Sequence, residues 1–303
     1  MYHLLKKTKD YLLNPKSLLK LAKRKGLISI YKLITPPPDY VCERQWDNLI
    51  ILDSCRFDAF ALVNRIPGRL TKMISAGSST WEWLPKNFLG RKLKDIIYIS
   101  ANPFISRWYL RKTFGYIPFY KIVEVWRHGW NKKFGTVNPS SVNRITLMLS
   151  KLHPNKRFII HYLQPHQPYI GAIKLIDSIP GGSIGAKVFG VKWNYRKDAF
   201  QMLKEGKISV DFLWKAYISN LKYVLRYVEK LLPHLMGKIV ISSDHGEAFG
   251  TFNLFYGHPP NTPLPELIEV PWFEVETYHH KQLYAEAEKF YLSIDRLLTL
   301  RSS

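Results

Sequence analysis

The order of apolar and polar positions divides most of the chain into short apolar runs separated by segments with helical periodicity. Apolar residues recur at three- and four-residue spacing over residues 209–235, which predicts a long amphipathic helix. The runs with the length and β-branched content of buried strands are 48–53, 95–100, 157–163, 237–244 and 267–275. Buried strands that alternate with helical segments indicate an α/β fold with a mostly parallel central sheet and helices on both faces.

The N-terminus differs from the rest of the chain. The first 33 residues carry nine Lys or Arg against the single Asp10, with Leu and Ile at helical spacing between them. This pattern is typical of a basic amphipathic helix on an anionic membrane surface, and equally of a solvated helix packed on a larger domain. The prolines of TPPPDY at 35–40 predict the end of that helix and a short stiff linker. We therefore expect a basic segment over residues 1–38, a second domain over 39–303 and, within it, an irregular insertion or lid at 171–207.

Composition limits the classes of partner. The chain carries 45 Lys and Arg against 23 Asp and Glu, a net charge of +22, and 46% of its residues are hydrophobic. This apolar content excludes a disordered chain. The positive field favours anionic partners, namely phosphorylated or sulfated substrates, nucleic acid or an acidic membrane face, and charge alone does not choose among them.

Cysteine content and hydropathy bear on the compartment. Cys42 and Cys55 are too few for a disulfide framework, which favours a reducing environment. The N-terminus lacks the continuous apolar region of a signal peptide, and no stretch of 18 or more apolar residues occurs. We expect a cytoplasmic protein that does not span a bilayer, with peripheral attachment to the inner membrane face through residues 1–33 as an alternative.

Polar side chains end several of the predicted strands. Asp53 ends the first, His161 and His166 lie in and after the third, and Asp244 and His245 end the fourth. In an open α/β sheet these strand ends meet at the edge where ligands bind, and carboxylates with imidazoles are the donors that Zn²⁺ or Mn²⁺ prefers. For Asp53 alone a helix N-cap is the competing interpretation. For the Asp-His pair, Gly246 could supply the turn that lets both side chains face one ion.

A hydroxyl-rich loop could supply the group that a metal activates. Ser78, Ser79 and Thr80 follow Gly77 and precede a helix expected to begin at Trp81. The N-terminal end of a helix can hold a phosphate through its free N–H groups, and a nearby cation lowers the pKa of a hydroxyl. Ordinary helix capping by Ser or Thr is the competing interpretation.

Taken in order, Asp53, the hydroxyl loop, HYLQPHQPY, SSDHGEAFG and YGHPP resemble the alkaline phosphatase superfamily, and most of all its sulfatase and phospho-transferase branch. The resemblance covers residues 46–275. It implies an alkaline-phosphatase-like fold for the second domain. It also implies a divalent metal, Zn²⁺ or Mn²⁺, as one or two ions.

Site roles follow from the resemblance position by position. Asp53 resembles the first-strand metal ligand, and Asp244 and His245 resemble the Asp-His ligand pair. Thr80 looks like the nucleophile that carries the phosphoryl group covalently in phosphoethanolamine transferases and lipoteichoic acid synthases, where it also contacts the metal.

Three further residues are candidates for contacts with the substrate. His166 and His258 are similar to the histidines that contact substrate or a second metal. Arg56 adds positive charge to the same anion site.

The sequence also departs from the family pattern. Sulfatases use a CxPxR-type motif, which is absent here; Cys55 lies too near the first strand and lacks the Pro. Phosphate esters are therefore favoured over sulfate esters. Ser78 and Ser79 stay open as alternative nucleophiles, and the usual C-terminal subdomain is expected to be reduced to a final helix at 284–298.

The function that these observations favour is a metal-dependent hydrolase or transferase of phosphate esters, working through a phosphoenzyme on glycan or lipid-linked substrates. A basic nucleic-acid- or membrane-binding protein is the alternative from another class. Nucleic acid is the weaker partner, because no nucleic-acid-binding motif occurs. A catalytically inactive member of the superfamily is the third interpretation.

Overall fold

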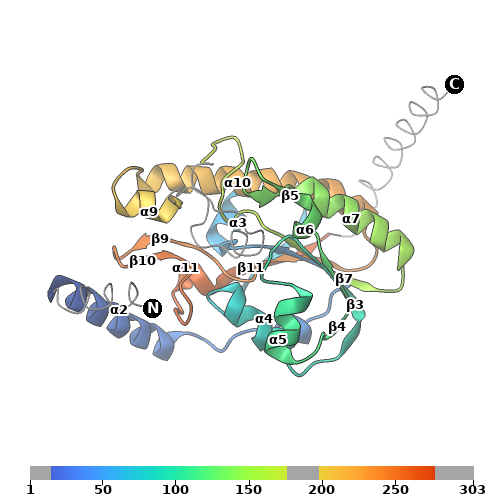
Figure 1. Ribbon diagram of the computed structural model, residues 1–303, viewed down its shortest axis with the longest axis horizontal. Coiled ribbons are helices and arrows are strands. Elements are labelled where there is room, and N and C mark those ends of the chain that lie inside the picture. Colours follow the sequence, from blue (N-terminus) through green and yellow to red (C-terminus); the bar gives the residue numbers. More distant parts are fainter. Residues whose placement is uncertain (1–14, 176–197, 277–303) are drawn as a thin grey trace.

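Seven strands form the central sheet of the computed structural model, which describes residues 15–175 and 198–276 (Figure 1). Their order is β2-β11-β8-β1-β7-β3-β4. The strands are β1 (Asn48–Leu52), β2 (Gly68–Ile74), β3 (Leu93–Ser100), β4 (Phe119–Glu124), β7 (Arg157–Tyr162), β8 (Ile239–Ser242) and β11 (Glu269–Val275). Strands β8, β1, β7, β3 and β4 run parallel, whereas β11 is antiparallel to both of its neighbours. The mostly parallel sheet is confirmed.

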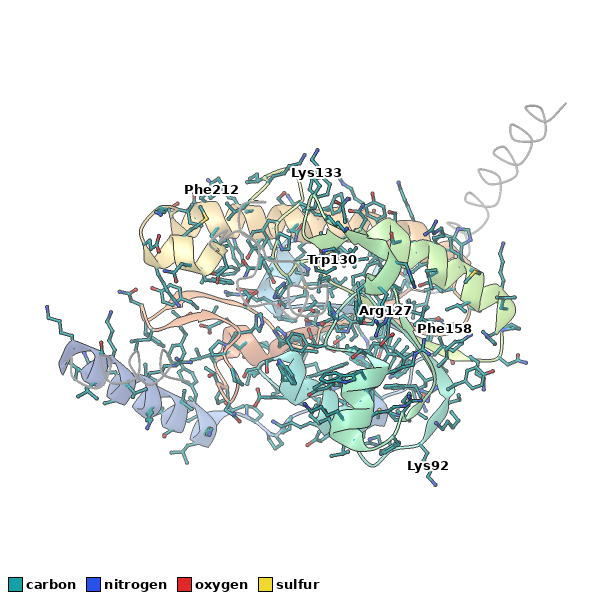
Figure 2. All side chains as sticks on the ribbon, viewed as in Figure 1. Lys92, Arg127, Trp130, Lys133, Phe158 and Phe212 are labelled. Atoms are coloured by element: carbon teal, nitrogen blue, oxygen red, sulfur yellow. The ribbon has the colours of Figure 1, made fainter. Side chains whose placement is uncertain are left out.

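Helices cover both faces of this sheet, and side chains fill the space between the layers (Figure 2). One face carries α3 (Phe57–Val63), α7 (Pro139–Leu152) and α10 (Val210–Leu231). The other carries α4 (Thr80–Phe88) and α5 (Arg107–Phe114), with the short turn η1 (Val41–Glu43). The long helix expected at 209–235 is confirmed as α10, followed by the turn η2 (Leu232–His234).

Strand β1 lies at the centre of the sheet and is buried along its whole length. Ile50 and Leu52 pack into the cluster under α10, whereas Leu49 and Ile51 pack into the cluster under α4. Each such aliphatic side chain contributes roughly 1.5–3 kcal/mol on burial, so a polar residue within β1 would be costly. This explains why residues 49–52 are all apolar and why Asp53 appears only where the strand ends. Asn48, the first residue of β1, is polar, and its Nδ2 donates to the Met236 carbonyl at 2.6 Å.

Smaller elements complete the described structure. Helix α6 (Trp126–Gly129) precedes the ribbon of β5 (Trp130–Asn131) and β6 (Thr136–Val137). A hairpin of β9 (Ala248–Thr251) and β10 (Phe255–Gly257) follows β8 and leads to α11 (Pro265–Ile268). Helix α9 (Ala199–Lys204) lies within the stretch expected to be an irregular insertion, so that expectation is wrong for 199–204; residues 176–197 lie outside the described residues.

The N-terminal helix α2 (Pro15–Ile34) ends directly before the proline stretch, as the sequence predicts. Its Leu27, Ile28 and Tyr31 pack against a small apolar cluster formed by the β9–β10 hairpin and α11. Its other leucines are exposed; Leu19 is 56% and Leu33 86% accessible. The helix therefore packs on the domain and still presents apolar and basic side chains to solvent.

Some expectations stay untested. The final helix predicted at 284–298 lies outside the described residues, and the boundary between residues 38 and 39 stays a prediction.

None of the described helices is both long enough and apolar enough to cross a membrane.

Gly246 shows a different role from the one expected. Its φ is outside the left-handed region, so it provides no special turn. Instead, its N–H donates to the Leu267 carbonyl at 2.8 Å, and a Cβ added there would overlap the carbonyl oxygen of Glu266. A glycine is needed because the backbone leading into β9 passes directly against α11.

We expect Gly246→Ala to lower the free energy of unfolding by about 1–3 kcal/mol, because the new methyl group forces the two backbones apart. Gly26→Ala is the matched control: it lies in α2 with nothing within 4 Å of the added Cβ and should be neutral or slightly stabilising. Denaturant titration of both variants measures the difference. Equal stabilities would mean that the contact with α11 relaxes at no cost.

Candidate functional site

The carboxyl ends of four adjacent parallel strands, β8, β1, β7 and β3, meet at one edge of the sheet. Asp53 follows β1, Asp244 lies two residues after β8, and His161 lies within β7. The β1 and β7 ends are joined directly, because the Asp53 N–H donates to the Tyr162 carbonyl at 3.2 Å. This is the edge where open α/β sheets bind ligands.

The two acids point to the same face because side chains alternate along a strand. In β1, Leu49 and Ile51 face the α4 side, and Asp53 continues that series. In β8, Val240 faces the α4 side, and Asp244, four residues later, falls on the same side of the alternation. Both carboxylates are therefore directed toward the N-terminal end of α4.

Asp53, Asp244 and His245 form a compact group of metal-ligand type. One ligand atom from each lies within 4.8 Å of the others, and no side chain of the three is more than 2% exposed. The Nε2 atom of His245 is 3.4 Å from Asp244 Oδ2 and 3.8 Å from Asp53 Oδ1. Two buried carboxylates at this separation repel each other, and a cation between them relieves the repulsion.

Asp53 is not a helix cap, so the competing interpretation is wrong. Helix α3 begins at Phe57, with Arg56 at its N-cap position. The Asp53 carboxylate instead accepts hydrogen bonds from Ser54 Oγ at 3.1 Å and Asn102 Nδ2 at 2.6 Å. Burial opposes its ionisation, but the nearby imidazoles of His161, His166 and His245 outweigh burial and hold the pKa of Asp53 well below its ordinary value.

The hydroxyls of Ser78, Ser79 and Thr80, at the start of α4, differ in their contacts. Thr80, the first residue of the helix and one before the expected start, donates from Oγ1 to Asp244 Oδ2 at 2.6 Å and lies 3.4 Å from His245 Nε2. Ser79 holds the N-cap position without a side-chain capping bond. Ser78 Oγ lies 2.8 Å from Glu82 Oε2 and 2.9 Å from the Pro259 carbonyl oxygen. Of the three, Thr80 is the hydroxyl that contacts the acid cluster.

Two further side chains reach this cluster: His161, expected among the strand-end imidazoles, and Asn102, which the sequence did not indicate. Asn102, after β3, lies 2.6 Å from Asp53 Oδ2 and 3.4 Å from Thr80 Oγ1 through its Nδ2. His161 is fully buried; its Nδ1 meets the Tyr98 hydroxyl at 2.9 Å, and its Nε2 has no hydrogen-bond partner among the described residues. That Nε2 lies 3.6 Å from Asp53 Oδ2. The position of His161 at a strand end signalled its place, whereas an Asn in a loop gives no such signal.

His166, Glu247 and His258 form a second group, nearer the surface. One ligand atom from each lies within 4.8 Å of the others, with Glu247 buried and both histidines half-buried. His258 Nδ1 lies 2.8 Å from Glu247 Oε1, whereas Glu247 Oε2 has no partner among the described residues. Burial lowers the pKa of His258, but the charge and hydrogen bond of Glu247 prevail and raise it to about 9.

The two groups are contiguous. The ring centroid of His258 lies 4.5 Å from that of His245 and 5.1 Å from that of His166. Glu247, which follows the Asp-His pair in the sequence, was assigned no role before; here it fixes the orientation of His258.

The loop that carries His166 is held from two sides. The His166 N–H donates to the Asp53 carbonyl at 3.0 Å. From α10, buried Asn220 donates to the Pro165 and His166 carbonyls at 3.0 and 3.2 Å and accepts from the Ile170 N–H at 3.0 Å. These hydrogen bonds fix the loop that carries the His166 imidazole.

Arg56 lies beside the site, and its guanidinium is already engaged. It binds both carboxylate oxygens of Asp58, at 2.6 and 2.9 Å, and its Nη1 lies 3.3 Å from the Glu247 carbonyl. It also stacks on Trp214, 5.0 Å from the ring centroid. A direct role of Arg56 in binding substrate stays a prediction.

Both groups have the chemistry of metal sites. Asp53, Asp244 and His245, with Thr80 Oγ1 beside them, offer oxygen and nitrogen donors, and His166, Glu247 and His258 offer the same donor types. The unpartnered atoms, His161 Nε2 and Glu247 Oε2, are buried polar groups that a cation or its ligands would satisfy.

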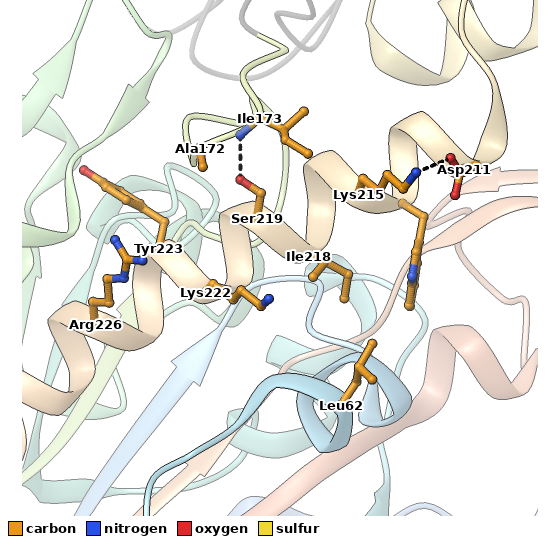
Figure 3. Close-up of a pocket in the computed structure, with 11 residues that line it drawn as sticks. Leu62, Ala172, Ile173, Asp211, Lys215, Ile218, Ser219, Lys222, Tyr223 and Arg226 are labelled. Carbon is orange, nitrogen blue, oxygen red and sulfur yellow. Dashed lines mark hydrogen bonds and ion pairs between the residues drawn. The ribbon is translucent and has the colours of Figure 1, made fainter.

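A separate hollow of about 490 Å³ lies along the outer face of α10 (Figure 3). It is lined by Leu62, Ala172, Ile173, Asp211, Trp214, Lys215, Ile218, Ser219, Lys222, Tyr223 and Arg226. None of these belongs to either group, so this hollow is not where the acid and imidazole side chains converge.

Comparison with solved structures gives the fold independently of the motifs. The soluble domain of lipooligosaccharide phosphoethanolamine transferase A from Neisseria meningitidis matches with a TM-score of 0.50 and 13% identity, over 75% of each chain. The integral membrane form of the same transferase matches with a TM-score of 0.50 and 12% identity, over 95% of this chain and 60% of that one. This chain therefore spans less than two thirds of the full-length transferase.

Comparisons of the sequence alone give no match. No family model matches the chain, and no curated protein matches it. The fold is accordingly shown by structure alone: a mostly parallel alkaline-phosphatase-like sheet, similar to that of the phosphoethanolamine transferases. The sequence motifs resemble the same class of transferase.

Proposed function

We propose that the chain is a metal-dependent phosphoryl transferase or hydrolase that acts on phosphate esters through Thr80. The observation that carries this proposal is the 2.6 Å hydrogen bond from Thr80 Oγ1 to Asp244 Oδ2 at the start of α4. A buried hydroxyl that donates to an acid has a base for its proton, and the helix N-terminus beside it favours an anion.

Asp53, Asp244 and His245 would hold one divalent ion, Zn²⁺ or Mn²⁺, with Thr80 as a further ligand. His166, Glu247 and His258 would hold a second ion or contact the substrate directly. When bound, such an ion lowers the pKa of the hydroxyl and stabilises charge on phosphoryl oxygens. Removing two adjacent buried carboxylates from water without a counter-charge is unfavourable, which supports a cation at the first group.

The chain's own residues account for the displacement. Thr80 Oγ1 attacks phosphorus and forms the new P–O bond while its proton passes to Asp244, its hydrogen-bond acceptor. The bond from phosphorus to the ester oxygen breaks, and solvent protonates the released oxygen. Water or an acceptor hydroxyl then attacks phosphorus and gives up its proton to solvent, the Thr80–phosphorus bond breaks, and Thr80 regains its proton from Asp244. His166 and His258 stabilise the equatorial or leaving oxygens.

The acceptor decides between the two reactions, because water gives hydrolysis and a glycan or lipid hydroxyl gives transfer. Transfer is favoured by the likeness to proteins named as phosphoethanolamine transferases. Phosphate is favoured over sulfate, because Thr80 occupies the position of the nucleophile and no CxPxR-type motif occurs. The cytoplasmic location stays a prediction.

The first test is metal content. Asp244→Asn should lower the bound Zn²⁺ or Mn²⁺ to a small fraction of that in the unaltered protein, measured by elemental mass spectrometry after dialysis. The amide removes a negative charge from the ligand group. Asp211→Asn is the matched control, since this carboxylate is exposed on α10 and pairs with Lys215. Equal metal content in the two variants would contradict the ligand assignment.

The second test is the nucleophile. Thr80→Ala should reduce turnover of an aryl phosphate ester by roughly 10³-fold or more, because the group that attacks phosphorus is lost. Thr80→Ser keeps a hydroxyl and should retain part of the activity. Intact-mass analysis of the unaltered protein during turnover should detect a phosphorylated species that Thr80→Ala lacks. Ser78→Ala and Ser79→Ala are controls; loss of the phosphorylated species in either would move the nucleophile to that residue.

The third test concerns Asn102, which donates toward both Asp53 and Thr80. Asn102→Ala should lower kcat by roughly 10–100-fold, because Asp53 and Thr80 lose a shared hydrogen-bond donor. Metal content should fall little, in contrast with Asp244→Asn. Asn131→Ala, at the β5–β6 ribbon, is the control. An unchanged kcat in Asn102→Ala would make this contact structural only.

A further inference from the structure

A second hollow, of about 450 Å³, lies where α2, α9 and the β9–β10 hairpin meet. Figure 1 shows α2 running alongside this hairpin, with α9 beyond it. The hollow is lined by Ser17, Lys20, Leu21, Arg24, Lys204, Asn253, Leu254 and Tyr256. It shares no residue with either candidate metal group.

The lining holds three cations and no acid. Lys20 and Arg24 come from α2, and Lys204 comes from α9, so the charges converge from separate elements. None of the three forms an ion pair with any residue in the described parts of the chain. Unpaired cations that face one hollow attract an anion more strongly than the same charges spread over a surface.

Aromatic rings fix two of these cations. The Arg24 guanidinium lies 5.4 Å from the Phe255 ring centroid, and the Lys204 ammonium lies 4.9 Å from that of Tyr256. Both rings belong to β10. Cations held against ring faces keep their N–H donors for another partner, which lowers the entropy lost when an anion binds.

Exposed apolar side chains occur on the elements that form the hollow. On α2, Leu18 is 43% exposed, Leu19 56% and Leu21 44%. At the turn of the hairpin, Phe252 is 56% exposed. Basic residues with exposed leucine and phenylalanine side chains are the composition of segments that lie in the interface of an anionic bilayer.

We propose that this hollow is a second anion site, which takes the phosphate head group of an anionic lipid. Lys20, Arg24 and Lys204 donate to the phosphate oxygens. The leucines of α2 and Phe252 enter the bilayer interface beside them. The site extends the expected membrane contact of the basic N-terminus to α9 and the hairpin.

The hairpin joins this site to the candidate metal groups. Strand β9 begins directly after Glu247, and β10 ends directly before His258. Because β9 has four residues and a strand rises about 3.3 Å per residue, the head group would lie within roughly one strand length of those two residues. A lipid held there places the bilayer next to the proposed reaction, which matters only if the proposed function holds; the lipid site itself does not depend on it.

The test is binding to vesicles of phosphatidylcholine, with and without phosphatidylglycerol, measured by sedimentation. Lys20→Glu and Lys204→Glu should each weaken binding to the anionic vesicles by about fivefold or more, corresponding to about 1 kcal/mol per cation near a charged surface. Neither change should affect turnover of a water-soluble ester, which separates this proposal from the proposed function.

Two controls carry the same charge change. Lys23→Glu lies on α2 but does not line the hollow, and Lys92→Glu lies at the opposite end of the molecule (Figure 2). Lys92→Glu should have little effect, and Lys204→Glu should have a larger effect than Lys23→Glu. If Lys23→Glu matches Lys204→Glu, general attraction explains the binding and the site is overturned.

A separate measurement distinguishes a lipid phosphate from a soluble phosphate compound. Inorganic phosphate titrated into the unaltered protein, followed by calorimetry, should bind weakly and compete poorly with anionic vesicles. Tight phosphate binding without vesicle binding would assign the hollow to a soluble phosphate compound and overturn the lipid.

Discussion

Two carboxylates buried next to each other, Asp53 and Asp244, form the constraint on which the rest of the site depends. Such a pair is costly to bury and is stabilised only when donors or a positive charge surround it. The surrounding residues meet that requirement from every side: the Thr80 hydroxyl, the Asn102 amide, and the imidazoles of His161 and His245. The repulsion between two buried carboxylates would destabilise an ordinary core. Here the two carboxylates lie at the sheet edge where α/β proteins bind ligands.

The fold supplies this arrangement through strand order. Because β1 lies between β8 and β7, each strand contributes a polar residue to the same edge, and the alternation of side chains decides which face they occupy. Helix α4 lies on that face and brings its N-terminal end, with Thr80, to the acids. Helix α10, on the other face, holds the His166 loop through Asn220. Each layer of the domain therefore positions a different part of the site.

Much of this was predictable from the sequence, and the exceptions have physical reasons. The five buried strands and α10 carry strong patterns because they are covered on both sides or bury a wide face. Strands β2 and β4 were not predicted; both lie at sheet edges, where solvent replaces one layer and polar residues interrupt the apolar run. The acids and histidines at strand ends were identifiable from their positions. Asn102 was not, since its role depends on the meeting of two loops distant in sequence.

The gradient of burial across the site sets a direction for any reaction there. Asp53, Asp244 and Thr80 are enclosed, whereas His166 and His258 are half-buried and border solvent. Under the proposed function, a phosphorus atom attacked by Thr80 would lie between the enclosed acids and the half-buried imidazoles, with the departing group on the solvent side. In that case the buried groups would contact the phosphoryl end of the substrate, and the departing group would lie near solvent. Such a geometry tolerates a bulky departing group, including one that stays anchored in a larger assembly.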